Sequence, residues 1–491
     1  MDIRTQLSPL ERLDLQQLHT VSTIVNEMSR CSFGARMLGE AAHTLHQWIQ
    51  EKKDKRPFIV YDGIEDCPLA HLLTQMVNHK WFADVLLPAE FIYDKRTRGR
   101  NALVLGRYSE RHEQKLVERA GRTIFINEFG MAPHGKTQDG YFPDVVFADP
   151  IFIVPIIYFT LKERMGIVPT NSIQLMGELK HFCGIAAEIA HGAETLYAMV
   201  TDPDCTVFMT LSGAMTVAKM SLLICDMIDR DMVQYISSTG ALMAHGLIES
   251  VGLKHYKYDP AHNDATLAEQ GLNRVTDTLE PEENFTHIDE VIHEVLDTMV
   301  PSSNFGSWDL HDAIGKYLAI HYPTERGILK SAYEKCIPVI VPAFIDSEIG
   351  NDVRVHNMFR TRDNRPKLVM DMERDTDTLF RMALDAKRLG IFSIGGGVPR
   401  NNTQNVAPLI DIANNRLGES FPRKKFSYGC RICPDAPYFG HMSGCTYSEG
   451  KSWGKMQPDG MFAEIRTDAT LVWPFILKYV MDKIDFPVIH P

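Results

Sequence analysis

Residues 391–397 read IFSIGGG, and this stretch decides the class of fold. Its mostly apolar start predicts a short buried strand, and Gly395, Gly396 and Gly397 follow at once. A helix-like run begins at Thr403. In α/β folds, a strand that ends in glycine before a helix brings backbone amides close to a ligand. The triplet is therefore a candidate ligand-binding turn, and the alternative is a tight turn without a ligand.

Segments before this stretch show the same alternation of strands and helices. Residues 337–344 (IPVIVPAF) and 367–372 (KLVMDM) predict strands, and residues 376–389 predict a helix. This alternation predicts an α/β, Rossmann-like fold with a largely parallel sheet flanked by helices. No GxGxxG fingerprint occurs, which disfavours an ordinary Rossmann dehydrogenase.

The first half of the chain contains an internal repeat at an offset of about 150 residues. Residues 36–48 match residues 187–199 in apolar spacing, and FIVYDG at 58–63 corresponds to VFMTLSG at 207–213. The match continues through predicted helices and strands at 72–80 and 222–230, and at 83–87 and 233–237. We therefore expect an N-terminal partial duplication of the first α/β module. A coincidental likeness between two amphipathic stretches is the alternative.

Composition excludes several classes of protein. The chain has 491 residues, 44% of them hydrophobic, and a formal charge of -12. Without a basic stripe, this charge disfavours nucleic acid as a partner. It favours a cationic small substrate, although solubility alone explains mild acidity equally well. The longest apolar run, residues 151–159, is about half a membrane helix, so we expect it to be buried core and expect no membrane partner.

The first residues lack the order of a signal peptide, and the nine cysteines are an odd number, so we expect a cytoplasmic protein with reduced thiols. Cys430 and Cys433 form a CxxC near His441, but no second CxxC is present, and no metal site is predicted. His191 and His245 lie in helix-like runs. Most histidines in such positions make ordinary hydrogen bonds, so we assign no functional role to either residue.

Two further strand ends carry small residues. Ser212-Gly213-Ala214 and Ser238-Thr239-Gly240 both follow apolar strands. Together with the glycine triplet they offer three strand ends to one crevice, which predicts a dinucleotide-binding site.

The segment SGCTYSEGKSWGK at residues 443–455 contains a carboxylate, a tryptophan and a lysine within its last seven residues. A lysine amine is a nucleophile only when neutral, and an aromatic wall or a nearby cation lowers its pKa. Lys455 therefore suits an imine-forming role. Glu449 is suited to bind an ammonium group and Trp453 to lie against a methylene chain, so a polyamine fits all three. The alternative is an exposed loop with ordinary charges.

From about Cys183 to Lys483 the chain resembles the deoxyhypusine synthase family in several ordered blocks. The family's active-site tail, with Gly and Ser before Glu and Ser-Trp-Gly-Lys, is matched by Gly440, Ser443, Glu449 and residues 452–455. Thr467-Asp468 stands where the family has Ala-Asp. Other matching blocks are residues 273–275 with 281–284, and residues 337–339 with Asp346.

This resemblance implies a reaction and its cofactor. NAD takes a hydride from the carbon beside an amine nitrogen of spermidine or a related donor such as putrescine. Lys455 then holds the aminobutyl fragment as an imine until an acceptor amine takes it and the hydride returns. The implied NAD contacts are Ser238, Thr239, Gly240, Asp346, Gly395, Gly396, Gly397 and Asp468.

Departures from the eukaryotic family pattern concern the polyamine pocket. Phe439-Gly440-His441-Met442-Ser443 replaces Asp-Gly-Ser-Asp-Ser, Asn401 and Asn402 replace two histidines, and Asn351 replaces an acid. These changes resemble bacterial paralogs linked to homospermidine synthesis, so we favour a small-amine acceptor. The alternatives are transfer to a lysine of the hypusine-bearing translation factor, and a catalytically silent assembly partner.

Domain boundaries are predicted from composition and from the resemblance. Residues 130–143 are rich in proline and glycine, which suits a connecting loop. We expect a degenerate α/β half-repeat over residues 1–130, a linker over 131–170 and an NAD-binding catalytic domain over 171–491. The N-terminal copy lacks the glycine triplet and the lysine tail, so we expect it to bind no cofactor productively. The family implies a homo-oligomer, and specifically a tetramer.

Overall fold

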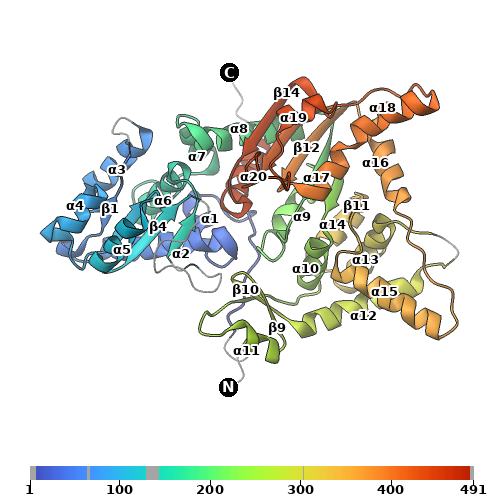
Figure 1. Cartoon of the computed structure of the whole chain (residues 1–491), viewed down its shortest axis with the longest axis horizontal. Coiled ribbons are helices and arrows are strands. Elements are labelled where there is room, and N and C mark those ends of the chain that lie inside the picture. The colour runs from blue at the N-terminus through green and yellow to red at the C-terminus, as the bar shows by residue number, and fades with distance from the viewer. Residues whose placement is uncertain (1–6, 64–66, 129–141, 143, 302–303, 487–491) are drawn as a thin grey trace. The chain divides into compact units, whose positions relative to one another are not determined.

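The computed structural model describes residues 7–63, 67–128, 142, 144–301 and 304–486, and it divides into two compact units (Figure 1). The larger unit comprises Met1–Leu13, Glu194–Lys257 and Asp264–Ala469. The smaller unit, here called the N-terminal unit, comprises Asp14–Ala193, Tyr258–Asn263 and Thr470–Pro491. Both are α/β units, which confirms the predicted fold class.

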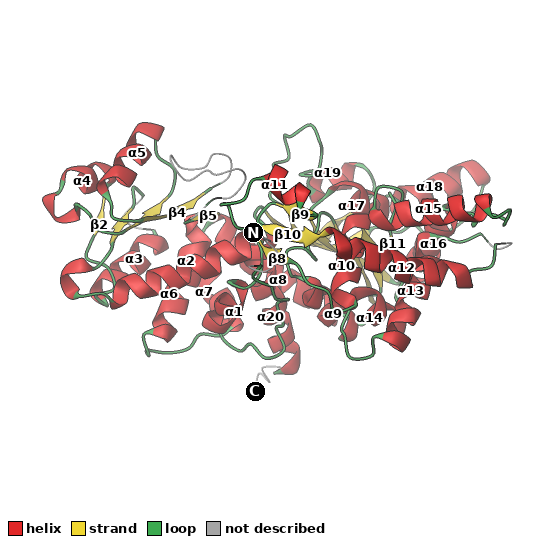
Figure 2. Cartoon of the chain, turned by 90° about the horizontal axis from the view of Figure 1, so that it is seen from below, coloured by secondary structure: helices red, strands yellow, loops and turns green. Residues whose placement is uncertain are grey.

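The larger unit is built on a six-stranded sheet in which every pairing is parallel. Figure 2 shows in yellow the strands of the molecule and in red the helices that pack around them. Its strand order is β11-β7-β6-β12-β13-β14. The strands are β6 (Cys205–Leu211), β7 (Tyr235–Ser238), β11 (Val339–Ile340), β12 (Arg388–Ile394), β13 (Phe426–Ile432) and β14 (Met456–Ile465). Most of their apolar residues are buried because helices cover both faces of such a sheet.

Helices and a small antiparallel sheet complete this unit. The antiparallel sheet has the order β8-β10-β9, with β8 (Tyr256–Lys257), β9 (Leu272–Val275) and β10 (Thr278–Pro281). The helices are α9 (Ser221–Asp229), α10 (Gly240–Ser250), α11 (Asp264–Glu269), α12 (Glu282–Thr298), α13 (Ser307–His321), α14 (Ile328–Glu334), α15 (Glu348–Arg362), α16 (Glu373–Asp385), α17 (Gly397–Gln404), α18 (Val406–Leu417) and α19 (Tyr447–Ser452). Helix α8 (Gly184–Thr201), which precedes β6, belongs to the larger unit only from Glu194, and α20 (Ala469–Asp485), which follows β14, belongs from Thr470 to the N-terminal unit.

Two predicted strands are shorter or absent. In the segment 337–344 only Val339–Ile340 pairs, because Pro338 and Pro342 on either side have no amide hydrogen to donate to a sheet. The segment 367–372 was wrongly predicted to be a strand and forms one isolated bridge at Met370. Its Leu368 backbone instead exchanges two hydrogen bonds with the side-chain amide of Asn357.

The N-terminal unit contains a five-stranded parallel sheet in the order β2-β1-β3-β4-β5. The strands are β1 (Phe58–Val60), β2 (Val85–Leu86), β3 (Ala102–Leu105), β4 (Thr123–Asn127) and β5 (Val145–Phe147). Its helices are α1 (Val21–Met28), α2 (Phe33–Gln50), α3 (Pro68–Asn78), α4 (Pro88–Tyr93), α5 (Glu110–Arg119), α6 (Pro150–Arg164) and α7 (Ser172–Leu179).

The duplication extends further than the sequence predicted. Strand order β2-β1-β3-β4-β5 has the same succession as β7-β6-β12-β13-β14. Gly106 after β3 and Gly395 after β12 both have positive φ, +90° and +76°. The helices after β5 and β14 each contain an internal proline, Pro155 and Pro474. The N-terminal unit thus repeats five of the six strands of the larger sheet, all except β11, where we had expected a half-repeat.

The segment predicted to be a linker contains regular structure. Residues 129–141 and 143 lie outside the described residues, but β5 and α6 occupy most of residues 144–170. Phe152, Ile153 and Ile157 of α6 are fully buried, which confirms the predicted core run. This stretch is therefore part of the N-terminal unit. The independence of residues 171–491 as a catalytic domain stays a prediction.

Among the described residues, no helix combines the length and the apolar character that crossing a membrane requires.

A glycine determines how closely α13 and α14 pack. A methyl group on Gly315 would overlap the carbonyl oxygen of Leu329 and lie 2.7 Å from Tyr333 Cβ. We expect Gly315→Ala to lower the free energy of unfolding by about 1–3 kcal/mol, because the two helices would have to separate. Urea unfolding followed by circular dichroism measures this change.

Gly177 provides the matched control, because it lies in helix α7 with open space where a methyl group would go. Gly177→Ala is expected to be neutral or to stabilise by up to about 1 kcal/mol. Equal effects of the two substitutions would contradict the packing argument.

Candidate active site

The eight residues predicted to contact the cofactor line a single cavity of about 420 Å³ in the larger unit. They come from the ends of β7 and β12, from the turn before α15 and from the residue before α20. The three strand ends predicted to share a crevice therefore do so. These residues are Ser238, Thr239, Gly240, Asp346, Gly395, Gly396, Gly397 and Asp468, and Ser443 lines the same cavity.

Close approach requires glycine at this edge of the sheet. A methyl group on Gly396 would overlap the carbonyl oxygen of Ser443, and one on Gly240 would overlap the Ser347 side chain. Gly395 and Gly397 have φ of +76° and +65°, in the left-handed region that favours glycine. Ser212 Oγ donates to the Gly396 carbonyl and fixes the turn. Here the glycines bring the lysine-bearing segment against the end of β12.

The chemistry of this cavity fits a dinucleotide. Helix α10 begins at Gly240 and α17 at Gly397, so free amides at two helix starts line the cavity and suit a pyrophosphate. Asp346, Asp435 and Asp468 supply carboxylates, which accept hydrogen bonds from ribose hydroxyls. These are the residues that would hold NAD.

A second cavity of about 530 Å³ contains Lys455 together with four residues predicted to bind substrate: Glu449, Trp453, His441 and Asn401. Gly397 and Val398 line both this cavity and the first one, so the two cavities adjoin along the start of α17. The predicted lysine is therefore next to the predicted cofactor site.

Lys455 is held by its backbone and by its amine. Its amide donates to the Gly450 carbonyl at 3.0 Å, and its carbonyl accepts from the Phe426 amide at 2.9 Å. Its Nζ donates to Asn401 Oδ1 at 2.8 Å. Burial and the nearby positive charge of Arg400 lower the pKa of Lys455, while Glu449 acts in the opposite direction. This environment favours the neutral amine that an imine-forming lysine needs.

Helix α19 positions the other side chains of this cavity. Thr446 caps the helix, because its hydroxyl accepts from the Glu449 amide at 3.1 Å. Trp453, just after the helix, is 66% exposed and lines the cavity. Glu449 and Trp453 thus lie on one turn beside Lys455.

Two arginines that the sequence reasoning missed anchor this segment. Arg400 Nη1 donates to the Cys445 carbonyl at 2.7 Å, and Arg431 Nη1 donates to the same oxygen at 2.5 Å. Arg431 also pairs with Glu464, which accepts from the Tyr447 amide. Arg431 could have been identified from the sequence, because it is a charged residue within the mostly apolar segment 426–432. Arg400 follows the glycine triplet by three residues and had no distinguishing signal.

Three predicted substrate residues, Ser443, Gly440 and Asn351, do not join the lysine cavity, and Ser443 lines the first cavity instead. Gly440 lines neither of the two cavities. Asn351 lies on α15 in a third cavity of about 460 Å³ that shares no lining residue with the other two. Asn351 was predicted from its position in the family's sequence pattern, and that pattern does not show which cavity the side chain faces. Burial, together with Asp289 and Glu348, raises the pKa of its neighbour Asp352 to about 7, so the third cavity is crowded with carboxylates.

The CxxC cysteines are buried on and after β13. Burial raises the pKa of Cys430 to about 12 and also raises that of Cys433. Cys433 lines the first cavity. Both therefore favour the thiol over the reactive thiolate.

Sequence comparison identifies relatives that cover the larger part of the chain. A probable deoxyhypusine synthase 2 from Methanosarcina acetivorans is 31% identical over 296 residues, which are 60% of this chain and 82% of that protein. A deoxyhypusine synthase-like protein from Chlorobaculum parvum is 30% identical over 328 residues, 66% of this chain and 91% of that protein. A solved structure of a putative deoxyhypusine synthase from Entamoeba histolytica covers 64% of this chain and 94% of its own, with TM-score 0.43 and 14% identity.

The family model for deoxyhypusine synthase matches residues 174–480, a range that contains the glycine triplet, Asp468 and Lys455. The match spans more than half of the chain. This protein belongs to the deoxyhypusine synthase family, whose members are transferases of an aminobutyl group.

Proposed function

We propose that this protein is an NAD-dependent aminobutyl transferase in which Lys455 carries the aminobutyl group as an imine. The observation that carries the proposal is the place of Lys455. Its amine, with a lowered pKa, lies in a cavity that adjoins the glycine-lined cavity. The donor proposed is a polyamine, spermidine or putrescine.

Each residue of the lysine cavity has a role in this chemistry. Bound NAD supplies hydride removal from, and return to, the carbon beside an amine nitrogen. Neutral Lys455 bonds to that carbon and releases the leaving amine. Asn401 accepts a hydrogen bond from the lysine and keeps Nζ in place. Glu449 binds the distal ammonium of the fragment, and Trp453 lies along its methylene chain.

For the acceptor we propose a small amine, so that the product is homospermidine or a related polyamine. Asn401 and Asn402 after the glycine triplet, and the segment Phe439–Ser443, support this choice, because they depart from the eukaryotic pattern. The second candidate acceptor is a lysine of the hypusine-bearing translation factor. The relatives named as probable deoxyhypusine synthases favour that candidate. Product analysis by mass spectrometry, with both acceptors offered together, distinguishes the two.

We further propose that the protein works in the cytoplasm as a homo-oligomer, specifically a tetramer as the family resemblance implies. A stable and fully active monomer in sedimentation experiments would contradict shared sites.

Lys455→Arg is expected to abolish imine formation, because a guanidinium does not form the adduct. Borohydride added with NAD and spermidine should leave an aminobutyl mass increment on Lys455 of the parent and none on the variant. Transfer should fall by roughly 10²-fold or more, the scale of losing one catalytic group. Lys451→Arg is the control, since Lys451 is exposed on α19 and donates to the Pro458 carbonyl. If Lys455→Arg still transfers the aminobutyl group at the full rate, the reaction does not pass through an imine on Lys455. Loss of transfer in both variants would indicate a structural effect of the substitutions.

The pH dependence of trapping should move in opposite directions in two variants. The reactive form is the neutral amine, so the trapping rate rises as pH increases through the pKa of Lys455. Arg400→Gln removes a positive charge that lowers this pKa, so the rise should shift to higher pH. Glu449→Gln removes a negative charge that raises it, so the rise should shift to lower pH. Arg400→Lys keeps the charge and is the control; shifts of the same sign would contradict the assignment.

A further inference from the structure

The lysine cavity has one side chain that carries a negative charge. Glu449 is the carboxylate among the described residues that line it. Cys445, in the same wall, stays a thiol, because burial and the Glu449 carboxylate beside it both raise its pKa. The other lining side chains that can carry charge are neutral or positive; they are Arg400, His441 and Lys455. The cavity therefore offers one anionic partner to a bound substrate.

Arg400 makes a second cation unfavourable in this cavity. Its side chain is 5% exposed, and its Nη1 donates to the uncharged carbonyl of Cys445. Its Nε has no hydrogen-bond partner within the part of the chain that the structure describes. A first ammonium group can pair with Glu449. A second would lack a carboxylate partner beside a wall that already contains a buried cation.

The carboxylates of the neighbouring cavities lie outside the lysine cavity. One group lines the first cavity, where the proposed NAD complex assigns these side chains to ribose hydroxyls: Asp346, Asp435 and Asp468. Another group lines the third cavity, which shares no lining residue with the lysine cavity: Glu282, Glu348 and Asp352. Neither group adds negative charge to the wall around Lys455.

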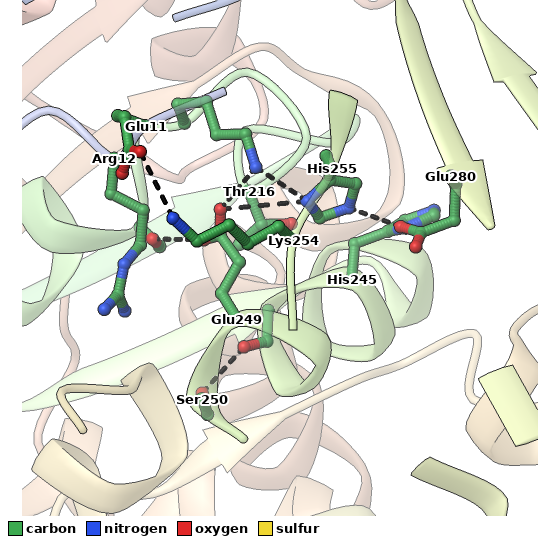
Figure 3. Close-up of polar contacts among 12 residues, drawn as sticks. Glu11, Arg12, Thr216, His245, Glu249, Ser250, Lys254, His255 and Glu280 are labelled. Carbon is green, nitrogen blue, oxygen red and sulfur yellow. Dashed lines mark hydrogen bonds and ion pairs between the residues drawn. The ribbon is translucent and has the colours of Figure 1, made fainter. Parts of the chain in front are cut away.

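Two further buried carboxylates are already held by other side chains (Figure 3). Lys219 Nζ donates to Glu249 Oε1 at 2.8 Å, and His255 Nε2 lies 2.5 Å from Glu280 Oε2. His245 Nδ1 lies 3.4 Å from the same glutamate oxygen. All five side chains are at most 7% exposed, and none of them lines the lysine cavity. These carboxylates are therefore satisfied within their own network.

Met442 occupies a position where a carboxylate would change the charge balance of the lysine cavity. It lines this cavity, is 51% exposed and has a φ of +64°. The backbone in this left-handed region tolerates aspartate and asparagine better than methionine. The side chain present is nevertheless apolar and uncharged. Together with Trp453, Met442 offers the cavity a surface that suits a methylene chain and not an ammonium group.

We propose that the donor is an unbranched diamine without an internal amine, such as putrescine, and that Met442 and Arg400 disfavour spermidine in this role. The inference rests on the function proposed above and narrows its donor. A diamine whose reacting amine is neutral keeps one ammonium group, which pairs with Glu449. Spermidine keeps two ammonium groups when its internal amine reacts, and the second has no carboxylate partner in this cavity.

The leaving group identifies the donor. A hydride passes from the carbon beside the reacting amine to the bound cofactor, which is reduced, and the carbon is oxidised to an iminium. Lys455 Nζ bonds to that carbon. The bond from the carbon to the first nitrogen then breaks, the electron pair stays on that nitrogen, and ammonia leaves. The lysine keeps the four-carbon chain as a protonated imine. Spermidine would leave the same imine and release a three-carbon diamine.

The released amine and the donor preference test this assignment in the full-length protein. With NAD and putrescine, borohydride should trap the aminobutyl increment on Lys455, and isotope-labelled putrescine should release labelled ammonia. At low donor concentration, trapping should be faster with putrescine than with spermidine by roughly 10-fold or more, the scale of one missing charge-assisted hydrogen bond. Equal rates, or a preference for spermidine, would overturn the proposal.

Met442→Asp and Met442→Asn form a matched pair, because the two new side chains have the same shape and both suit a φ of +64°. The aspartate adds a carboxylate to the cavity, so the preference for putrescine over spermidine should fall by about 10-fold or more. The asparagine adds no charge and should keep the preference of the parent. Equal shifts in the two variants would contradict the charge argument.

Calorimetric titration separates this inference from the imine mechanism. If neither donor leaves an adduct on Lys455 of the parent, the proposed function fails. Spermidine binding to the two Met442 variants then decides the charge balance of the cavity. Tighter binding by the aspartate variant supports a cavity with a single anionic partner, and equal binding by both variants overturns it.

Discussion

The candidate active site depends on one carbonyl oxygen, that of Cys445, which accepts hydrogen bonds from both Arg400 and Arg431. These bonds tie the segment that carries Lys455 to α17 on one side and to β13 on the other. The arginines are almost completely buried, so their charges must be satisfied by such partners. The same arrangement places the positive charge of Arg400 near Lys455 and lowers the pKa of the lysine. Anchoring and activation therefore have a common cause.

The larger unit separates two electrostatic environments for amines. Around Lys455, burial and Arg400 favour the neutral amine. In the third cavity several carboxylates lie close together, and burial with the neighbouring Asp289 and Glu348 raises the pKa of Asp352 to about 7. The acidic balance of the whole chain is consistent with cationic substrates, but the division between the cavities is a local property.

The N-terminal unit keeps much of the backbone arrangement of the larger unit, although the residues at the ends of its strands differ. It keeps the strand succession, the positive-φ glycine at Gly106 and an aspartate, Asp149, at the start of the helix after its last strand. Asp149 caps α6 by accepting from the Ile151 amide at 2.8 Å, whereas Asp468 lines the glycine-lined cavity. Core packing fixes the backbone geometry, so this geometry is kept even where the residues that contact ligands have been replaced.

The sequence by itself determined the fold class, the glycine-lined strand ends and the reactive segment ending at Lys455, because each depends on residues close together in the chain. Strand periodicity, backbone freedom at glycine and the chemistry of an amine are local properties. Only the tertiary structure decided that Asn351 faces a separate cavity, that His245 is backed by Glu280, and that the duplication includes five strands. These relations join residues far apart in sequence, and burial and long-range strand pairing set them. No local pattern encodes which distant side chains are brought into contact.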